Sequence, residues 1–315
     1  MGIFYRLYKY LRKNPDHPSY HLLIFITLTF GIIFAGYLIG AAIVMALYGV
    51  NTVMDLAQLN LTNPNAVTSL WILQIVSTTI PIIVSSLIFA YWIVRDPQEY
   101  LKQSFKFPGL LLVIVFCVML ISSPLIELLS NINQKMVLPH FLNGLQRWMR
   151  QAEDQAQKLT AVLLQMKTIS SMLFKLLVVG LLTAIVEEFM FRGVIQTIFI
   201  KWTKNPHAAI WITAALFSAF HMEFFGFLPR MLLGVLFGYF VVWSGSIWTS
   251  VWAHLLNNGT AVVVEYLHQN KQIKFNPDDQ HIFNYGSYLF SLIIVLFLLY
   301  LYRTIAMGKV KMPVL

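Results

Sequence analysis

The chain has few charged residues. Asp, Glu, Lys and Arg make up only 11% of its 315 residues, whereas they account for about 25% of an ordinary soluble domain. Hydrophobic residues make up 58% of the sequence, and the mean hydropathy is +0.70. This composition excludes an ordinary soluble protein. It predicts an all-α, multi-pass membrane protein, a bundle of transmembrane helices in contact with the lipid bilayer.

Cysteine is nearly absent as well. Cys117 is the one cysteine, which excludes an intramolecular disulfide and any multi-cysteine metal site. The sequence also lacks internal repeats and low-complexity linkers, so we expect residues 1–315 to form a single integral membrane domain. Lys and Arg outnumber Asp and Glu by 22 to 13, but they lie mostly in short segments beside apolar runs, as orientation signals do. We therefore expect no nucleic acid partner.

Long apolar runs are abundant. A spanning helix needs about 20 mostly apolar residues, because the hydrocarbon layer is about 30 Å thick. Eight segments reach or approach that length, at about 21–48, 68–94, 107–130, 170–200, 206–222, 227–244, 246–267 and 287–303. The fifth and sixth are short and closely joined, so a pair there could instead be re-entrant. An even number of spans would place both termini on one side.

The distribution of Lys and Arg predicts which side that is. In an eight-span protein, twelve of them share the face that carries both termini, so we expect this face to be cytoplasmic and the protein to lie in the cell (inner) membrane. The opposite face is not free of positive charge, because residues 131–168 and 271–274 also contain Lys and Arg. The basic N-terminal segment precedes an apolar run that is too long for a signal-peptide core, so we expect it to be retained. The twelve are Arg6, Lys9, Arg12, Lys13, Arg95, Lys102, Lys106, Lys201, Lys204, Arg303, Lys309 and Lys311.

Residues 131–168 predict an amphipathic helix between the third and fourth apolar segments. Apolar side chains recur there at helical spacing beside charged positions, at Phe141, Leu142, Leu145, Trp148 and Met149. Such a helix would lie on the membrane surface. The alternative is a helix outside the membrane that packs on the bundle.

The fourth apolar segment contains the stretch VEEFMFRG, residues 186–193, with three ionisable side chains. Each would cost about 2.5 to 3.5 kcal/mol at mid-membrane, and such residues usually have a function. Glu188 and Arg192 are four residues apart and share a helix face, so we expect them to form a structural ion pair. Glu187 lies about 140° away from Arg192 around the helix. It is left beside a like charge in a dry environment, both of which oppose its ionisation, and it is therefore a candidate general base.

Polar partners for Glu187 occur downstream. Phe217 and His221 lie four residues apart in the fifth segment, and His254 and Asn258 lie four apart in the seventh, so each pair shares a helix face. A lone histidine on an apolar helix is often only a hydrogen-bonded packing residue. Two histidines, an asparagine and a glutamate at one membrane depth would favour a functional cluster.

The spacing is compatible with one depth. Glu187 and His221 are each 17 residues from Lys204, where the chain turns between the two helices. At about 1.5 Å per residue they would lie about 21 to 25 Å from the cytoplasmic end, and His254 and Asn258 about 12 to 18 Å. The difference is within the uncertainty of helix boundaries, so we predict a single cluster.

These residues resemble the signature of the CPBP family of intramembrane proteases, which takes its name from CAAX prenyl proteases and bacteriocin-processing (Abi-type) proteins. The ordered motifs are Glu-Glu-x-x-x-Arg at 187–192, Phe-x-x-x-His at 217–221 and His-x-x-x-Asn at 254–258, all in apolar segments. The resemblance covers about residues 170–268, which would form the catalytic core. It implies a hydrolase that cleaves peptides or membrane-associated proteins. Residues 1–168 carry no motif that matches.

The resemblance also implies residue roles. Glu187 and His221 would activate the attacking water, His254 and Asn258 would stabilise the oxyanion, and Glu188, Arg192 and Phe217 would support the site. The family has been described both as metalloproteases and as glutamate-dependent enzymes. Glu187, His221 and His254 could supply the three protein ligands of a catalytic zinc ion, although the His-Glu-x-x-His motif is absent. We favour water activated directly by glutamate, which needs no cofactor.

Two other classes of function remain open at the level of sequence. An ion- or proton-coupled carrier would also place Glu, His and Arg near mid-membrane, but such carriers commonly contain repeats with interrupted helices, which this chain lacks. A non-catalytic membrane scaffold could use the polar cluster only for folding.

Overall fold

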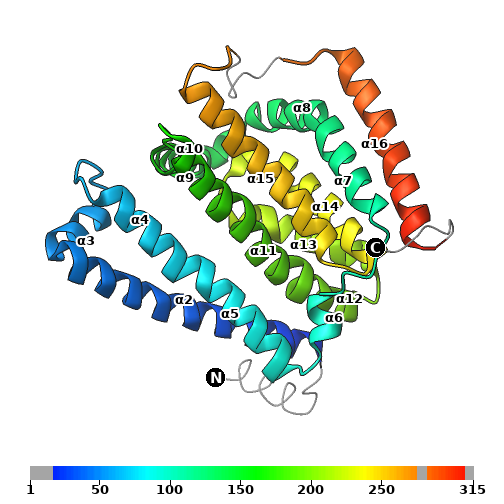
Figure 1. Ribbon diagram of the computed structural model, residues 1–315, viewed down its shortest axis with the longest axis horizontal. Helices are drawn as coiled ribbons and strands as arrows, with labels where there is room; N and C mark the ends of the chain where they lie inside the picture. The colour runs from blue at the N-terminus through cyan, green and yellow to red at the C-terminus, as the bar shows by residue number, and fades with distance from the viewer. Residues whose placement is uncertain (1–16, 275–281, 309–315) are drawn as a thin grey trace. The chain divides into compact units, whose positions relative to one another are not determined.

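The computed structural model describes residues 17–274 and 282–308, and every regular element in these two stretches is helical. Each of the eight apolar segments contains helix (Figure 1). The segment at 107–130 is divided into α7 (Leu110–Ile121) and α8 (Ser123–Gln134), which are bent by 45° relative to each other. The segment at 170–200 is a continuous run of five pieces: α10 (Ile169–Lys175), η4 (Leu176–Leu182), α11 (Thr183–Glu188), η5 (Phe189–Ile195) and α12 (Gln196–Thr203).

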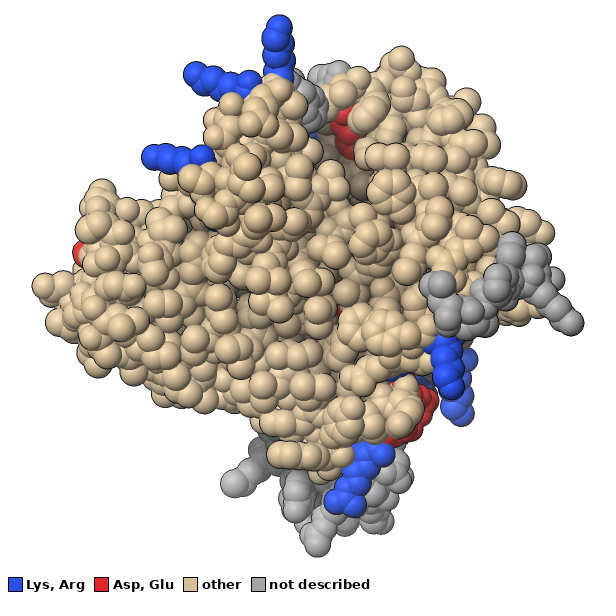
Figure 2. All heavy atoms as spheres, viewed as in Figure 1, with Lys and Arg blue, Asp and Glu red and all other residues tan. Residues whose placement is uncertain are grey.

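Five helices of the described residues are long and apolar enough to cross a membrane, or six if the bent pair α7 and α8 is one span. The structure therefore confirms a polytopic helical membrane protein. The fifth and seventh predicted spans correspond to α13 (Pro206–Phe220) and α15 (Trp248–Gln269). Helix α13 has only 15 residues, and α15 contains several polar residues, so the count of eight spans stays a prediction. On the face drawn in Figure 2, most surface atoms belong to uncharged residues, as lipid contact requires.

Orientation in the membrane also stays a prediction. Six of the twelve Lys and Arg residues that support it lie outside the described residues, as does the N-terminal segment that we expect to be retained. These six are Arg6, Lys9, Arg12, Lys13, Lys309 and Lys311.

The chain divides into two compact units, Met1–Lys102 with Phe189–Ala209, and Gln103–Glu188 with Ile210–Leu315. In the described part of the first unit, α2 (Pro18–Tyr48) packs along the helix formed by α4 (Ala66–Gln74), η1 (Ile75–Thr79), α5 (Ile80–Ile88) and η2 (Phe89–Ile93). Gly36 permits this approach, because a Cβ there would lie 2.5 Å from the carbonyl oxygen of Val76. The remaining helices are α3 (Val50–Ala57), α6 (Pro97–Leu101), η5 and α12.

In the second unit, α15 lies against η4, α11, α7 and α14 (Phe227–Ser244). Gly180 of η4 faces Gly259 of α15, and a Cβ at Gly180 would lie at an ordinary van der Waals distance of 3.7 Å from the Cα of Gly259. The helix α16 (Tyr285–Ala306) packs on α7 and α8. Helix α15 therefore carries its His254 and Asn258 past the helix that contains Glu187 and Glu188.

The segment 131–168 contains the predicted amphipathic helix, α9 (Asn143–Leu163), preceded by the 3-10 turn η3 (His140–Leu142). One face of α9 packs on the 3-10 turn η6 (Phe224–Gly226), where the Glu153 carboxylate accepts a hydrogen bond of 2.9 Å from the Phe225 amide. Phe141, Leu145 and Trp148 are exposed. Helix α9 thus packs on another part of the second unit. This agrees with the alternative interpretation, in which the helix packs on the bundle. It also leaves apolar side chains uncovered, and their contact with the membrane surface stays a prediction.

Candidate active site

The glutamate pair lies between two π-helical segments. Glu187 and Glu188 are the last residues of α11, with η4 before and η5 after it. π-Helical turns are rare and occur frequently at functional sites. Their wider turns leave backbone carbonyls open to side chains: the Thr183 hydroxyl donates to the Val178 oxygen at 3.0 Å, and the Asn258 amide donates to the Val179 oxygen at 3.2 Å.

Three side chains converge at the end of α11. The Oε2 atom of Glu187 lies 3.9 Å from Nε2 of His221 and 3.8 Å from Nε2 of His254. The Glu187 side chain is 15% exposed, that of His221 27%, and that of His254 4%, so the group is largely shielded but can be reached from outside. Residues predicted from three separate motifs therefore meet at one point of the second unit.

The contacts of the two Nδ1 atoms determine whether Nε2 of each histidine faces Glu187 as a hydrogen-bond donor or as an acceptor. Nδ1 of His221 lies 2.9 Å from the Phe217 carbonyl oxygen, and since a carbonyl only accepts, Nδ1 carries the proton. Nδ1 of His254 lies 2.9 Å from Oε1 of Glu188 and donates to it when that carboxylate is ionised. In neutral rings, both Nε2 atoms are therefore acceptors that face Glu187.

The gaps between these atoms suit a water molecule. Distances of 3.8 and 3.9 Å exceed the limit of about 3.2 Å for a direct hydrogen bond. Oε2 of Glu187 is buried and has no hydrogen-bond partner among the described residues. A water molecule can donate two hydrogen bonds, so one placed between these acceptors would satisfy two of them at once.

Zinc fits this group in chemistry but less well in geometry. One carboxylate and two imidazoles form a known ligand set for catalytic zinc. Two ligands at about 2.0 to 2.1 Å from a tetrahedral zinc ion lie about 3.3 Å apart, which is closer than these atoms are. Within residues 17–274 and 282–308, no set of three His, Cys, Asp or Glu side chains meets the requirements of a metal site. The residues do not form a ready zinc site, and no step proposed below passes through a metal.

Glu188 and Arg192 are both completely buried, with exposed fractions of 0%. Glu188 binds His254, a contact that the sequence did not indicate because the two residues are 66 positions apart. Arg192 lies in η5, which belongs to the first compact unit, whereas Glu188 ends a segment of the second. The ion pair between Glu188 and Arg192 stays a prediction.

Aromatic rings surround the two histidines. The Phe217 ring makes edge contacts with His221 and His254, with centroids 5.0 and 5.9 Å away, and its own carbonyl orients His221. Phe237 of α14 packs on His254 at 5.4 Å. The sequence did not single out Phe237, because one more phenylalanine in an apolar helix carries no signal.

Asn258 lies one turn beyond His254 on α15 and is held at both ends of its amide. Its Nδ2 donates to the Val179 oxygen, and its Oδ1 accepts a hydrogen bond of 3.1 Å from Nδ2 of Asn257. One N–H of Asn258 remains to donate elsewhere, because an amide nitrogen has two. Asn257 was also missed in the sequence, although its place beside Asn258 could have suggested this role.

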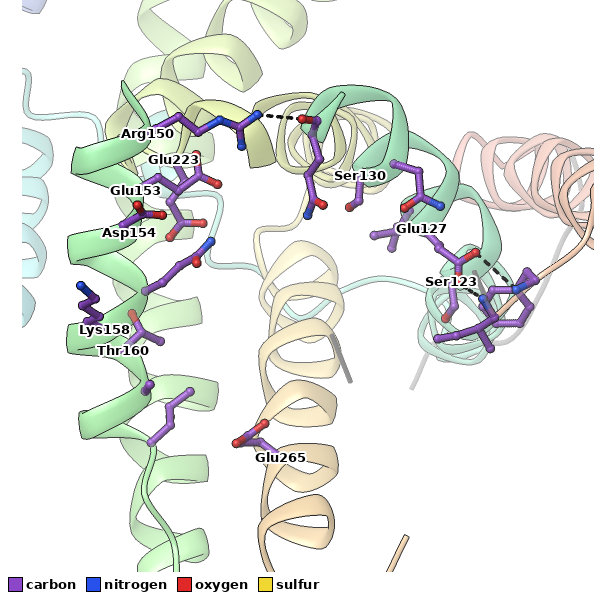
Figure 3. A pocket seen from close by; sticks show the side chains of 18 residues that line it. Ser123, Glu127, Ser130, Arg150, Glu153, Asp154, Lys158, Thr160, Glu223 and Glu265 are labelled. Carbon is purple, nitrogen blue, oxygen red and sulfur yellow. Dashed lines mark hydrogen bonds between the residues drawn. The ribbon is translucent and has the colours of Figure 1, made fainter. Parts of the chain in front are cut away.

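A large cavity lies in the same unit, beside the loop that follows His221 (Figure 3). Its volume is about 1340 Å³, and its walls come from α8, α9, the C-terminal half of α15, Glu223 and the residues before α16. Neither histidine of the cluster lines it.

Comparison with known proteins agrees with the three motifs. Residues 169–260 match a family model described as Rce1-like, "Type II CAAX prenyl endopeptidase Rce1-like". The matched range is less than a third of the chain, but it contains all three motifs, and it confirms the resemblance. No curated protein and no solved structure matched the chain.

Proposed function

We propose that this protein is an intramembrane endopeptidase in which Glu187 activates water. The similarity to the Rce1-like family supports a membrane-embedded protease of the CAAX type in general. The observation that carries the finer proposal is the position of Glu187 Oε2, within 3.9 Å of Nε2 on both His221 and His254. A peptide or a membrane protein would be the substrate, and nothing in the sequence requires a prenyl group on it.

The first step is attack by water. A water molecule held by Glu187 and His221 gives one proton to the Glu187 carboxylate while its oxygen forms a bond to the carbonyl carbon of the scissile peptide. The carbonyl π electrons move to the oxygen, which becomes the oxyanion of a tetrahedral intermediate. When the intermediate collapses, the C–N bond breaks and the proton on Glu187 passes to the departing amine.

The oxyanion needs hydrogen-bond donors. Asn258 has one N–H available beside its bond to Val179. His254 already directs Nδ1 to Glu188, so it can donate from Nε2 only when it carries a second proton. The buried Glu188 carboxylate balances the charge of that imidazolium. Glu188 therefore has a positioning and electrostatic role, and Glu187 has the chemical one.

The experiment is peptide cleavage by purified protein in detergent, with a panel of fluorogenic peptides. We expect cleavage by the native protein and loss of nearly all of it in Glu187→Gln. The matched control is Glu99→Gln, because Glu99 is a half-exposed carboxylate of the other compact unit. Normal cleavage by Glu187→Gln, or no cleavage of any peptide by the native protein, would contradict the proposal.

Chelation tests the direct role of glutamate. We expect the purified protein to keep its activity in the presence of a strong zinc chelator. Complete loss of activity with chelator, restored by added zinc, would instead assign Glu187, His221 and His254 as metal ligands.

We also propose a membrane and an orientation for the protein. The apolar helices support a multi-pass membrane protein, and we place it in the inner membrane with both termini in the cytoplasm.

A further inference from the structure

The cavity beside the His221 loop is large enough to hold part of a polypeptide. Its volume of about 1340 Å³ exceeds the roughly 300 to 1000 Å³ typical of small-molecule sites. All of its lining residues belong to the second compact unit, as do Glu187, His221 and His254. Figure 3 shows the labelled lining residues on α8, α9 and α15 and in the loop that contains Glu223.

Acidic residues are concentrated at this cavity. The protein has a formal net charge of +9, yet five of the ten Asp and Glu residues in the described part of the chain line this one space. Arg150 and Lys158 are the basic residues of its lining. The lining therefore has an excess of negative charge, opposite in sign to the protein. The five are Glu127, Glu153, Asp154, Glu223 and Glu265.

Three of these carboxylates already have structural partners. Glu127 accepts hydrogen bonds from the amides of Ile282 and Phe283 and from the Tyr288 hydroxyl. Glu153 accepts a hydrogen bond from the Phe225 amide, and Glu223 forms an ion pair with Arg230 at 2.5 Å.

The other two carboxylates are better placed to bind a ligand. Asp154 is exposed on α9. Glu265 on α15 is half-buried, and Oε1 of its carboxylate accepts a hydrogen bond of 2.6 Å from Gln269. Figure 3 shows Asp154 and Glu265 on the two helices that border the same space.

Two elements connect the cavity with the candidate active site. Glu223 follows His221 by two residues, in the loop that forms part of the cavity wall. Glu265 lies eleven residues after His254 on α15, which is three helical turns, so His254, Asn258 and Glu265 share one stripe of the helix. Along this stripe the cavity begins about 16 Å from His254.

We propose that this cavity binds a segment of the substrate that carries Lys or Arg, close in sequence to the bond that is cleaved. Asp154 and Glu265 recognise its ammonium or guanidinium groups. The inference deepens the proposed peptidase function and rests on it, because it assigns a substrate class to the same enzyme. A bound segment at this distance from His254 leaves about five extended residues between the cationic side chain and the scissile bond, at about 3.3 Å per residue.

The experiment compares three fluorogenic peptides with the same cleavage region and a flanking segment of Lys and Arg, Gln, or Glu residues. For the native protein we expect kcat/KM to be about tenfold higher for the cationic peptide than for the Gln peptide. A double variant, Asp154→Asn with Glu265→Gln, should reduce this ratio about fivefold, mainly through KM. Salt should reduce it as well, because the carboxylates are partly exposed.

The control is Asp96→Asn. Asp96 lies in the first compact unit and caps α6 through Oδ1, and asparagine keeps an oxygen for that hydrogen bond. This variant removes the same charge elsewhere and should keep the native preference for the cationic peptide.

Binding without catalysis separates the two proposals. Labelled cationic peptide should bind to the Glu187→Gln protein more tightly than labelled Gln peptide, and the double variant in that background should lose the difference. Cleavage of all three peptides with equal kcat/KM would overturn the cavity proposal and leave the peptidase function standing. If none is cleaved, the peptidase function fails. Equal binding of cationic and Gln peptides would then overturn the cavity proposal independently.

Discussion

His254 Nδ1 lies 2.9 Å from Glu188 Oε1, and both side chains are buried, with exposed fractions of 4% and 0%. This contact joins α15 to α11. It fixes the ring of His254 so that Nε2 faces Glu187, 3.8 Å away. The two adjacent glutamates thus reach the same histidine from opposite sides, one at each ring nitrogen.

Glu188→Gln should reduce both activity and stability. Glutamine can still accept from Nδ1, but it no longer balances a charged His254, so we expect kcat to fall about 100- to 1000-fold with little change in KM. We also predict that Glu188 pairs with Arg192, and breaking a buried ion pair costs about 3 to 5 kcal/mol, so the melting temperature in detergent should fall as well. Steady-state kinetics and thermal unfolding of the purified variant measure the two effects.

A double-mutant cycle tests whether Glu188 acts through His254. His254→Ala removes the donor, so adding Glu188→Gln to it should lower kcat little further. If the two losses multiply instead, the effect of Glu188 does not depend on the contact with His254.

Glu187→Gln should reduce activity strongly but leave stability nearly unchanged. Oε2 of Glu187 makes no hydrogen bond within the described residues, so the substitution removes no structural contact of that atom. A general base contributes about 100- to 10,000-fold to the rate. We expect kcat to fall by that factor while the melting temperature stays within a few degrees of the native value. An unstable Glu187→Gln beside a stable Glu188→Gln would reverse the assignment of base and supporting acid.

Asn257→Ala should lower kcat about three- to tenfold. Asn257 holds the amide oxygen of Asn258 at 3.1 Å, and without it the amide can turn away from the orientation in which its free N–H serves the oxyanion. Asn258→Ala should cost about 100- to 1000-fold, as loss of an oxyanion donor typically does. In the double variant, Asn257→Ala should add nothing, because its effect acts through Asn258. Multiplying losses would show that Asn257 has a separate role.

Much of the fold follows from the sequence. Apolar runs long enough to span the bilayer predicted the helical segments, and apolar residues at helical spacing beside charged positions predicted α9. Equal spacing of Glu187 and His221 from the turn at Lys204 placed them together, as the structure finds. The 45° bend between α7 and α8 occurs at Ser122, two residues before Pro124. Proline removes a helical hydrogen bond, so this bend could have been predicted.

The contacts within the site could not be predicted from the sequence in the same way. Spacing along an ideal α-helix pairs Glu188 with the nearby Arg192, whereas its contact with His254 depends on how α15 packs against α11. The π-helical turns η4 and η5 change the angle between successive side chains, and no residue type in the sequence predicts such turns. The acidic cavity combines residues from five separate segments between positions 123 and 283, so no local pattern reveals it.

Lys102 allows a test of the structure of the first compact unit that does not require peptidase activity. It follows α6, and its Nζ donates hydrogen bonds of 2.6 Å to the Glu99 carbonyl oxygen and the Thr197 hydroxyl. The pKa of Lys102 is lowered from 10.5 to about 8, mainly by burial of the ammonium group; the nearby Glu99 carboxylate opposes this shift and the Lys201 charge adds to it.

The sign of the effect on stability follows from proton binding. Between about pH 8 and 10.5 the unfolded chain keeps the Lys102 proton and the folded protein releases it, so the free energy of unfolding rises with pH in that range. The cost of burying the charge is present in full below pH 8. A pKa shift is worth about 1.4 kcal/mol per unit. Because the side chain retains some contact with water, we expect a smaller total gain, of about 2 kcal/mol.

Lys102→Met removes the titrating group and should remove this gain. Chemical unfolding in detergent at several values between pH 7 and 10.5 should show the native protein gaining about 2 kcal/mol relative to the variant as the pH rises. Lys106→Met is the matched control, because Lys106 is an exposed lysine four residues away, and its substitution should leave the native pH dependence in place. Parallel pH curves for the native protein and Lys102→Met would mean that Lys102 keeps its proton in the folded state. The ammonium group would then be held by Glu99 and Thr197 more strongly than burial disfavours it.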